Sequence, residues 1–191
     1  KNSGKIIKIV PNLYIAWHAG KSSWKRFKTL NKYSIGIEIT NPGSQFGYKK
    51  FSKKQISAIL RLSKFLVKKY KINNKNILGH SDVSPERKKD PGEKFPWKYL
   101  SQNKIGLWHT LKDKELRKSR KLKTNKVEKD FFFKNLFKIG YSNKVPKDLN
   151  KNKYLRDVTK AFQRRFRQEL INGIIDRECL FISINLIKKY N

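Results

Sequence analysis

Hydrophobic and polar residues alternate most regularly between Tyr33 and Thr40. From position 35, isoleucine stands at every second position, and the positions between carry small or polar residues and Glu38. Alternation with a period of two predicts a half-buried β-strand. A strand that packs its isoleucine face against the protein therefore presents the Glu38 carboxylate on its opposite face.

The stretch from Ser52 to Tyr70 has the 3.6-residue period of an amphipathic helix, with lysines opposite the apolar stripe. Ser52 and Gln55 have the spacing of a capping box, so we expect the helix to start there. This is the clearest helix of the chain.

Two shorter stretches predict further strands. Lys5–Val10 is a strand candidate preceded by a turn, and Ile77–Leu78 is a short buried strand that delivers His80 at its end.

The second half of the chain changes character. Residues 110–129 are mostly charged and predict a linker. Residues 130–191 show apolar residues at helical spacing over 131–139, over 153–166 and after Asp176, which can cap the last helix. We therefore expect a small all-α domain of three helices at the C-terminal end.

The charge of the chain is strongly positive. Lysine and arginine total 47 against 14 aspartates and glutamates, a formal net charge of +33. A field of this size attracts nucleic acids, anionic polymers and lipid surfaces. The basic residues are spread along the whole chain, however, so a specific nucleic-acid function is the weaker interpretation. The single cysteine, Cys179, excludes an internal disulfide, and no apolar run approaches the ~18 residues of a membrane span.

The candidate chemistry lies in residues 79–97, GHSDVSPERKKDPGEKFPW. His80 and Asp90 stand ten residues apart across a proline-containing loop and can ligate Zn²⁺ through nitrogen and carboxylate. Lys88 is a cation that can stabilise an oxyanion, and Glu38 is a carboxylate that can act as a general base. The alternative is structural, because an aspartate before Pro-Gly is usually a turn former and a lysine in so basic a chain is usually solvated. The spacing alone leaves both interpretations open.

Four blocks make the pattern more specific: AWHAGKSSW (16–24), NKYSIGIEITNPG (31–43), GHSDVSPERKKDPGEKFPW (79–97) and IGLW (105–108). In order and spacing they resemble the zinc-dependent N-acetylmuramoyl-L-alanine amidases of type 2, a family related to the peptidoglycan recognition proteins. The resemblance covers residues 1–109 and implies an α/β catalytic domain with a mixed central sheet flanked by helices. Residues 130–191, with AFQRRFRQELINGIIDRE, are similar to the three-helix peptidoglycan-binding module of some of these amidases.

The resemblance implies a role for each candidate in the loop and on the strand. His80 and Asp90 match the family's zinc ligands. Glu38 matches the catalytic glutamate, and Lys88 matches the lysine that helps to polarise the scissile carbonyl.

We also have expectations for three further residues, Arg87, His18 and His109. Arg87 stands where the family can meet a substrate carboxylate. His18 is not a zinc ligand in the family; it lines the substrate site or makes a buried hydrogen bond, and the structural interpretation is favoured. His109 is expected at the surface without a function.

One departure concerns the zinc site. The family's first zinc histidine lies on an earlier strand, so we expect this chain to begin after it, with its N-terminal strand or strands missing. His80 and Asp90 alone are too few ligands for tight zinc binding. The chain is therefore either a fragment of a working enzyme or a non-catalytic peptidoglycan-binding protein. The fragment is favoured because Glu38, His80, Lys88 and Asp90 are all retained.

The expected function is zinc-dependent hydrolysis of the amide bond between N-acetylmuramic acid, or its anhydro form, and L-alanine. The expected partners are peptidoglycan or muropeptides, with no specific nucleic acid. The pairing of the two regions most resembles periplasmic, lipoprotein-type amidases, so we expect the periplasm and a membrane anchor upstream of the given chain. The preference between intact wall and soluble fragments, and the oligomeric state, stay open.

Overall fold

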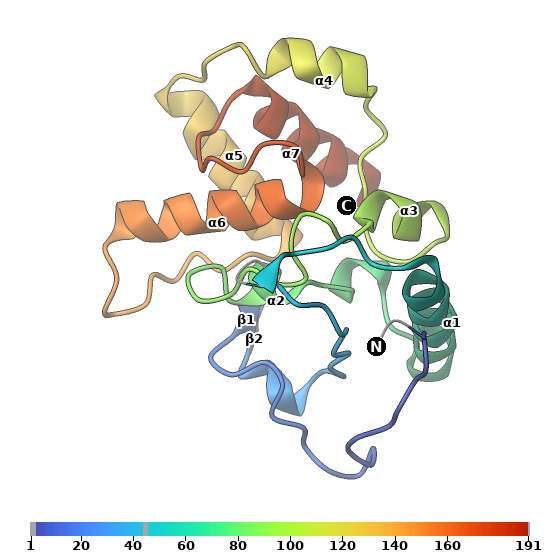
Figure 1. The fold of residues 1–191 in the computed structure, drawn as a ribbon. Helices are drawn as coiled ribbons and strands as arrows, with labels where there is room; N and C mark the ends of the chain where they lie inside the picture. Colours follow the sequence, from blue (N-terminus) through green and yellow to red (C-terminus); the bar gives the residue numbers. More distant parts are fainter. Residues whose placement is uncertain (1–2, 44–45, 191) are drawn as a thin grey trace.

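The computed structural model describes residues 3–43 and 46–190, and this part is mostly helical (Figure 1). Residues 1–2, 44–45 and 191, which include the outer ends of the two expected domains, lie outside it. In chain order the elements are β1 (Ser23–Trp24), β2 (Phe27–Lys28), η1 (Leu30–Lys32), α1 (Lys53–Tyr70), η3 (Asn74–Asn76), α2 (His80–Val83), α3 (Trp97–Gln102), α4 (Asp113–Ser119), α5 (Lys126–Ile139), α6 (Lys151–Phe166) and α7 (Arg177–Tyr190). Of the helices in the described part, none is long and apolar enough to cross a membrane.

The expected helix at Ser52–Tyr70 is confirmed as α1. Ser52 Oγ accepts a hydrogen bond from Gln55 N at 3.2 Å, and Gln55 Oε1 accepts one from Ser52 N at 2.9 Å, so the capping box is formed. Ile56 and Ile59 bury one face of α1 in a cluster with Phe95, Trp97, Leu100 and Ile105. The helix therefore supports the segment that leads into α3.

The sheet of the described residues is a two-stranded antiparallel ladder of β1 and β2, in which Trp24 pairs with Phe27. Lys5–Val10 and Tyr33–Thr40, expected as strands, form no ladder there. Alternation indicates which side chains share a face, but a strand also needs a partner in hydrogen-bonding register, which alternation does not specify. The fold class, α/β followed by an all-α region, is as expected.

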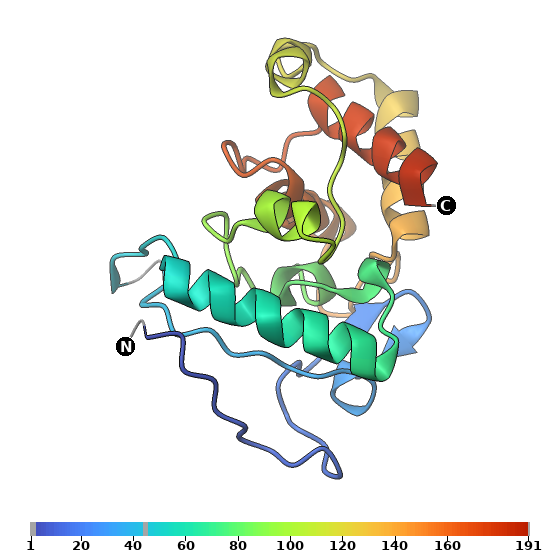
Figure 2. The ribbon, with the colours of Figure 1, turned by 90° about the vertical axis from the view of Figure 1, so that its right-hand side faces the viewer.

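The helices α4 to α7 gather at one end of the molecule, and α1 and the N-terminal segments lie at the other, with α2 and α3 between them (Figure 1, Figure 2). The three helices expected in residues 130–191 are confirmed as α5, α6 and α7. Asp176 Oδ1 accepts a hydrogen bond from Cys179 N at 3.1 Å and so caps α7, as predicted. Gly140 ends α5 at φ 145°, and a Cβ there would collide with the Trp24 ring.

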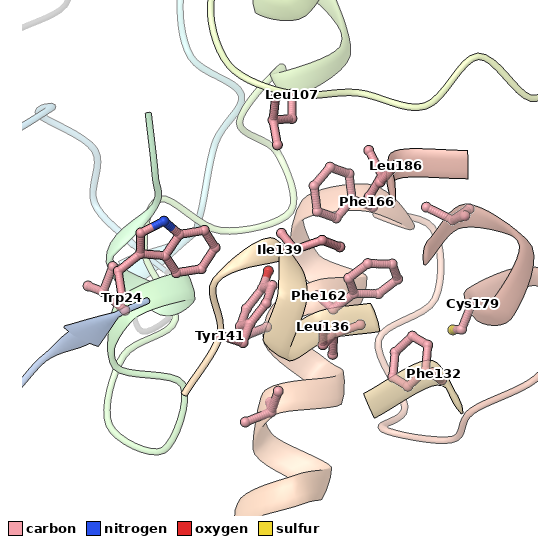
Figure 3. Packing of buried hydrophobic residues seen from close by; sticks show 14 of the residues in the cluster. Trp24, Leu107, Phe132, Leu136, Ile139, Tyr141, Phe162, Phe166, Cys179 and Leu186 are labelled. Carbon is pink, nitrogen blue, oxygen red and sulfur yellow. The ribbon is translucent and has the colours of Figure 1, made fainter. Parts of the chain in front are cut away.

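One hydrophobic core joins the two regions that were expected as separate domains. Trp24 of β1 meets Tyr141 edge-on, with 5.1 Å between ring centroids. Leu107 belongs to the same cluster as Phe132 and Phe162, which are fully buried between α5, α6 and α7 (Figure 3). The contacts between the two regions are therefore those of a shared interior.

Residues 110–129, expected as a charged linker, contain α4 and the first residues of α5. Leu116 of α4 is buried, and α4 lies against α7. Thr124 Oγ1 donates a hydrogen bond to Ile175 O at 2.6 Å. The division of the chain into two domains stays a prediction.

His109 is buried, with 7% of its surface exposed, so the expectation that it lies at the surface was wrong. Its ring stacks on Trp108 with 5.0 Å between centroids. Burial lowers the pKa of His109 to about 4, against the weaker opposing effect of the Asp113 carboxylate. The ring is therefore neutral in the folded protein at neutral and mildly acidic pH.

We expect His109 to make the fold sensitive to acid. An unfolded histidine has a pKa of about 6.5, so between pH ~6.5 and ~4 the unfolded chain binds a proton that the folded chain does not. The contribution of His109 to the free energy of unfolding should fall by up to about 3 kcal/mol as the pH drops through this window. Above the window, His109 should contribute no pH dependence. His109→Gln should lose this part of the pH dependence in urea unfolding. Identical pH dependence in wild type and variant would contradict the assignment.

Candidate active site

The expected metal loop begins with the short helix α2, whose first residue is His80. Gly79 precedes it and lies so close to Pro91 that a Cβ on Gly79 would be 2.8 Å from Pro91 Cδ. Ser81 N donates a hydrogen bond to Asp90 O at 3.0 Å. These contacts bring residues 79–81 next to residues 90–91, so Asp90 lies beside His80.

His80 and Asp90 lie side by side. His80 Nδ1 is 3.0 Å from Asp90 Oδ2, and His80 Nε2 is 3.1 Å from the carbonyl oxygen of Ala19. A carbonyl oxygen only accepts hydrogen bonds, so Nε2 carries a hydrogen and Nδ1 is directed at the carboxylate. Ala19 belongs to the AWHAG block, so two of the sequence blocks meet at this imidazole.

The Asp90 carboxylate is held in its charged form. Burial tends to raise its pKa, but the hydrogen bond from His80 and the positive charges of His80 and Lys88 together lower the pKa below its ordinary value. An anionic oxygen therefore faces an imidazole nitrogen at neutral pH.

Glu38 and Lys88 are placed differently. Lys88 is half-buried on the same loop, its backbone N–H donates to Ser84 O at 2.9 Å, and its charge acts on Asp90. Glu38 is exposed, and among the described residues its carboxylate has no hydrogen-bond or ion-pair partner. The structure thus brings His80, Asp90 and Lys88 together. Among the described residues, Glu38 has no hydrogen bond or ion pair with any of the three.

Arg87 is exposed and His18 is half-buried, and both make hydrogen bonds within the chain. Arg87 Nη2 donates to the carbonyl oxygens of Ala19 at 2.8 Å and Lys21 at 3.0 Å, which holds the turn after AWHAG. His18 Nε2 is 2.9 Å from Ser34 Oγ, and the ring lies against Gly36. Which of the two expected roles His18 has stays a prediction.

The donor chemistry of the loop fits zinc in part. Two ligands at about 2.1 Å from a tetrahedral Zn²⁺ lie about 3.4 Å apart, close to the 3.0 Å between His80 Nδ1 and Asp90 Oδ2. A zinc-binding imidazole usually donates its second nitrogen to a carbonyl or carboxylate, as His80 does to Ala19. Within residues 3–43 and 46–190, however, no three His, Cys, Asp or Glu side chains form a group that could hold a metal. The described residues therefore supply two candidate ligands, His80 and Asp90, without a third.

Beneath the loop lies a buried carboxylate that the sequence reasoning missed. Asp82, 1% exposed, accepts hydrogen bonds from Arg165 Nη1 at 2.6 Å and from the Tyr141 hydroxyl at 2.6 Å. Gly79 N donates to the same carboxylate at 2.8 Å. Arg165 Nη2 also donates to Ile77 O at 2.8 Å. One carboxylate thus joins the His80 loop to the helical region.

A sequence signal existed for only one partner of this network. An aspartate at the third position of a helix, three residues after a glycine N-cap, is favoured by the exposed N–H groups of the first turn, and Asp82 has that position. Arg165 stands in the run RRFR of a strongly basic chain. Composition offers no reason to distinguish it from a solvated arginine.

Comparisons with known proteins agree on one family. The family model described as N-acetylmuramoyl-L-alanine amidase matches residues 1–93. N-acetylmuramoyl-L-alanine amidase AmiD of Escherichia coli K12 is 35% identical over 191 residues, covering 97% of this chain and 68% of that protein. 1,6-Anhydro-N-acetylmuramyl-L-alanine amidase AmpD of Haemophilus influenzae is 37% identical over 106 residues, covering 54% of this chain and 55% of that protein.

Solved structures are similar over nearly the whole chain. E. coli AmiD in complex with the substrate anhydro-N-acetylmuramic acid-L-Ala-D-γ-Glu-L-Lys has a TM-score of 0.82 at 34% identity, over 97% of this chain and 73% of that one. Pseudomonas aeruginosa AmpDh3 in complex with anhydromuramic pentapeptide has a TM-score of 0.81 at 32% identity, over 97% and 74%. The similarity includes both the loop region and the C-terminal helices.

We expect the buried ion pair beneath the loop to be required for stability. Arg165→Met leaves the Asp82 carboxylate buried without its cation, which should cost about 3–5 kcal/mol of unfolding free energy. Lys98→Met is the control, because it breaks an ion pair whose side chains are 48% and 58% exposed and should cost no more than about 1 kcal/mol. Urea unfolding measures both, and equal losses would contradict the expectation.

Proposed function

Because this chain belongs to the N-acetylmuramoyl-L-alanine amidase family, we propose that it hydrolyses the amide bond between N-acetylmuramic acid, or its anhydro form, and L-alanine. The observation that carries the proposal is the convergence of His80, Asp90 and Lys88 on one loop, oriented by the Ala19 carbonyl. The muropeptides named in the structures of the two relatives support the substrate class.

We propose that His80 Nδ1 and Asp90 hold Zn²⁺, with a further ligand from outside the described residues. The Nε2–H contact to Ala19 supports this, because it leaves Nδ1 as the nitrogen that faces Asp90, where zinc would replace the hydrogen that Nδ1 donates to that carboxylate. When bound, zinc polarises a carbonyl and lowers the pKa of a bound water.

The remaining roles are proposed for three other charged side chains. Glu38 is proposed to take a proton from the attacking water and to pass it to the amine of L-alanine as the C–N bond breaks. Lys88 is proposed to stabilise the negative charge on the carbonyl oxygen during attack. Arg87 would bind a substrate carboxylate with the guanidinium nitrogens that the turn at Ala19 does not use.

We further propose that the C-terminal helical region contacts peptidoglycan and that the protein acts in the periplasm. The AFQRRFRQELINGIIDRE segment of that region supports the first statement, by its similarity to known peptidoglycan-binding modules. The membrane-anchored form expected from the sequence remains a prediction.

One observation favours a second candidate function. Because the described residues contain no group of three metal-binding side chains, the chain can also be a peptidoglycan-binding protein without catalysis. Zinc content separates the two candidates, since only the enzyme needs the metal.

We expect the Glu38 carboxylate to be essential for hydrolysis. Glu38→Gln keeps the size of the side chain and removes its basicity, so release of free stem peptide from muropeptides should fall about 10²–10⁴-fold. Glu115→Gln, on an exposed position of α4, should retain the wild-type rate. Stem-peptide release is followed by chromatography, and an unchanged rate in Glu38→Gln would overturn the assignment.

We expect one zinc ion per chain in the native protein, measured by elemental analysis. His80→Ala and Asp90→Ala should each lower the zinc content to well under one ion, because each removes a ligand. His109→Gln should keep the wild-type content, since the buried His109 stacks on Trp108, away from the loop. A metal-free native protein would favour the non-catalytic candidate.

A further inference from the structure

The short helix α2, which carries His80, contacts the helical region through the buried Asp82 carboxylate and through Val83, which belongs to the shared core. Asp82 lies two residues after His80 in the same turn, and Ser84 N donates to His80 O at 3.0 Å. His80 and Asp82 therefore share one helical turn, so the contacts that fix the Asp82 side chain also constrain the backbone that carries the His80 ring.

Besides Gly79 N of the loop, Asp82 has two donors, and these come from two places in the helical region. The Tyr141 hydroxyl, just after α5, donates to Oδ1, and Arg165, near the end of α6, donates to Oδ2. All three side chains are nearly fully buried. Burial and the Asp82 charge raise the pKa of Tyr141 well above its ordinary value, so the hydroxyl remains a donor.

Arg165 also holds both ends of the loop. Its Nη2 donates to the carbonyl oxygen of Ile77, just before the loop begins. Its guanidinium lies 4.2 Å from the ring centroid of Trp97, where the loop ends. One side chain therefore contacts the entry of the loop, its exit and the carboxylate between them.

We propose that Tyr141 and Arg165 are positioning residues for the amidase site, and that the C-terminal helical region orients the His80 loop in addition to any contact it makes with peptidoglycan. This inference rests on the proposed function, because it assigns His80 to the reacting site. The shared interior between Trp24 and Tyr141 supports it, since the same tyrosine that holds Asp82 is also fixed against β1.

Through these contacts, the geometry of the His80 loop depends on the helical region. A wall-binding module attached only by a linker can be moved without altering the catalytic geometry. Here the helical region supplies the buried donors of the loop, so a change inside it reaches the His80–Asp90 pair through α2. Binding of peptidoglycan to the helical region would then act on the site through the same contacts.

Tyr141→Phe tests the proposal, because it removes one hydroxyl and keeps the ring. Tyr154→Phe is the matched control: Tyr154 is equally buried and donates its hydroxyl to Ser142 O at 3.1 Å, a contact outside the loop. Hydrogen exchange of the Ser81 and Ser84 amides, which make the loop hydrogen bonds, should become about tenfold faster in Tyr141→Phe only. In muropeptide hydrolysis kcat should fall about fivefold with KM unchanged, again only in that variant.

A second pair of variants tests the same contacts if Tyr141→Phe has only a small effect on loop exchange and kcat. Arg165→Lys keeps the charge but loses the paired donors to Asp82 and Ile77, and Arg167→Lys makes the same change at a buried arginine that pairs with Asp176 instead. Faster loop exchange and lower kcat in Arg165→Lys alone support the proposal.

Equal loop exchange in each variant and its control overturns the proposal, as does an unchanged kcat in both Tyr141→Phe and Arg165→Lys. If the wild-type protein releases no stem peptide, the proposed function fails instead. The exchange comparison still decides in that case whether these residues orient the loop.

Discussion

A buried carboxylate needs compensation, and the partners of Asp82 determine how the two regions of this protein are joined. An isolated charge in a protein interior costs far more than a domain can tolerate, so it is either paired or neutralised. Asp82 is paired with Arg165 and receives further hydrogen bonds from Tyr141 and Gly79. These partners belong to the His80 loop and to the C-terminal helices, which cannot separate without leaving the charge unsatisfied.

The turn after AWHAG provides the second constraint on the candidate site. The Ala19 carbonyl accepts from both His80 Nε2 and Arg87 Nη2, so one backbone oxygen orients the imidazole and ties the middle of the loop to the same turn. This arrangement explains why a short run of small residues stands there, since Ala19 is buried and Gly20 lies against the Arg87 guanidinium. The orientation of His80 in turn directs Nδ1 at Asp90, and the family relationship gives that pair its proposed zinc-binding role.

Much of the fold followed from local pattern. The helices α1, α6 and α7 were predicted because amphipathic periodicity and caps such as Ser52–Gln55 and Asp176 act within a few residues. The loop bearing His80 and Asp90 was likewise visible from residue types and spacing. The strand predicted at Tyr33–Thr40 was wrong for the described residues, because a strand also depends on a partner elsewhere in the chain, which alternation does not specify. His109 was misplaced for a similar reason, since its burial comes from packing that spacing does not encode.

The sequence by itself determined the helices, the loop with its candidate ligands and the resemblance to one amidase family. All of these depend on residues close together in the chain or on blocks in a recognisable order. Only the tertiary structure decided that Arg165 is buried beneath the loop, that Tyr141 donates to Asp82, and that the two regions share an interior. The physical reason is that satisfaction of a buried charge depends on distance in space, and Asp82 and Arg165 are 83 positions apart in the chain.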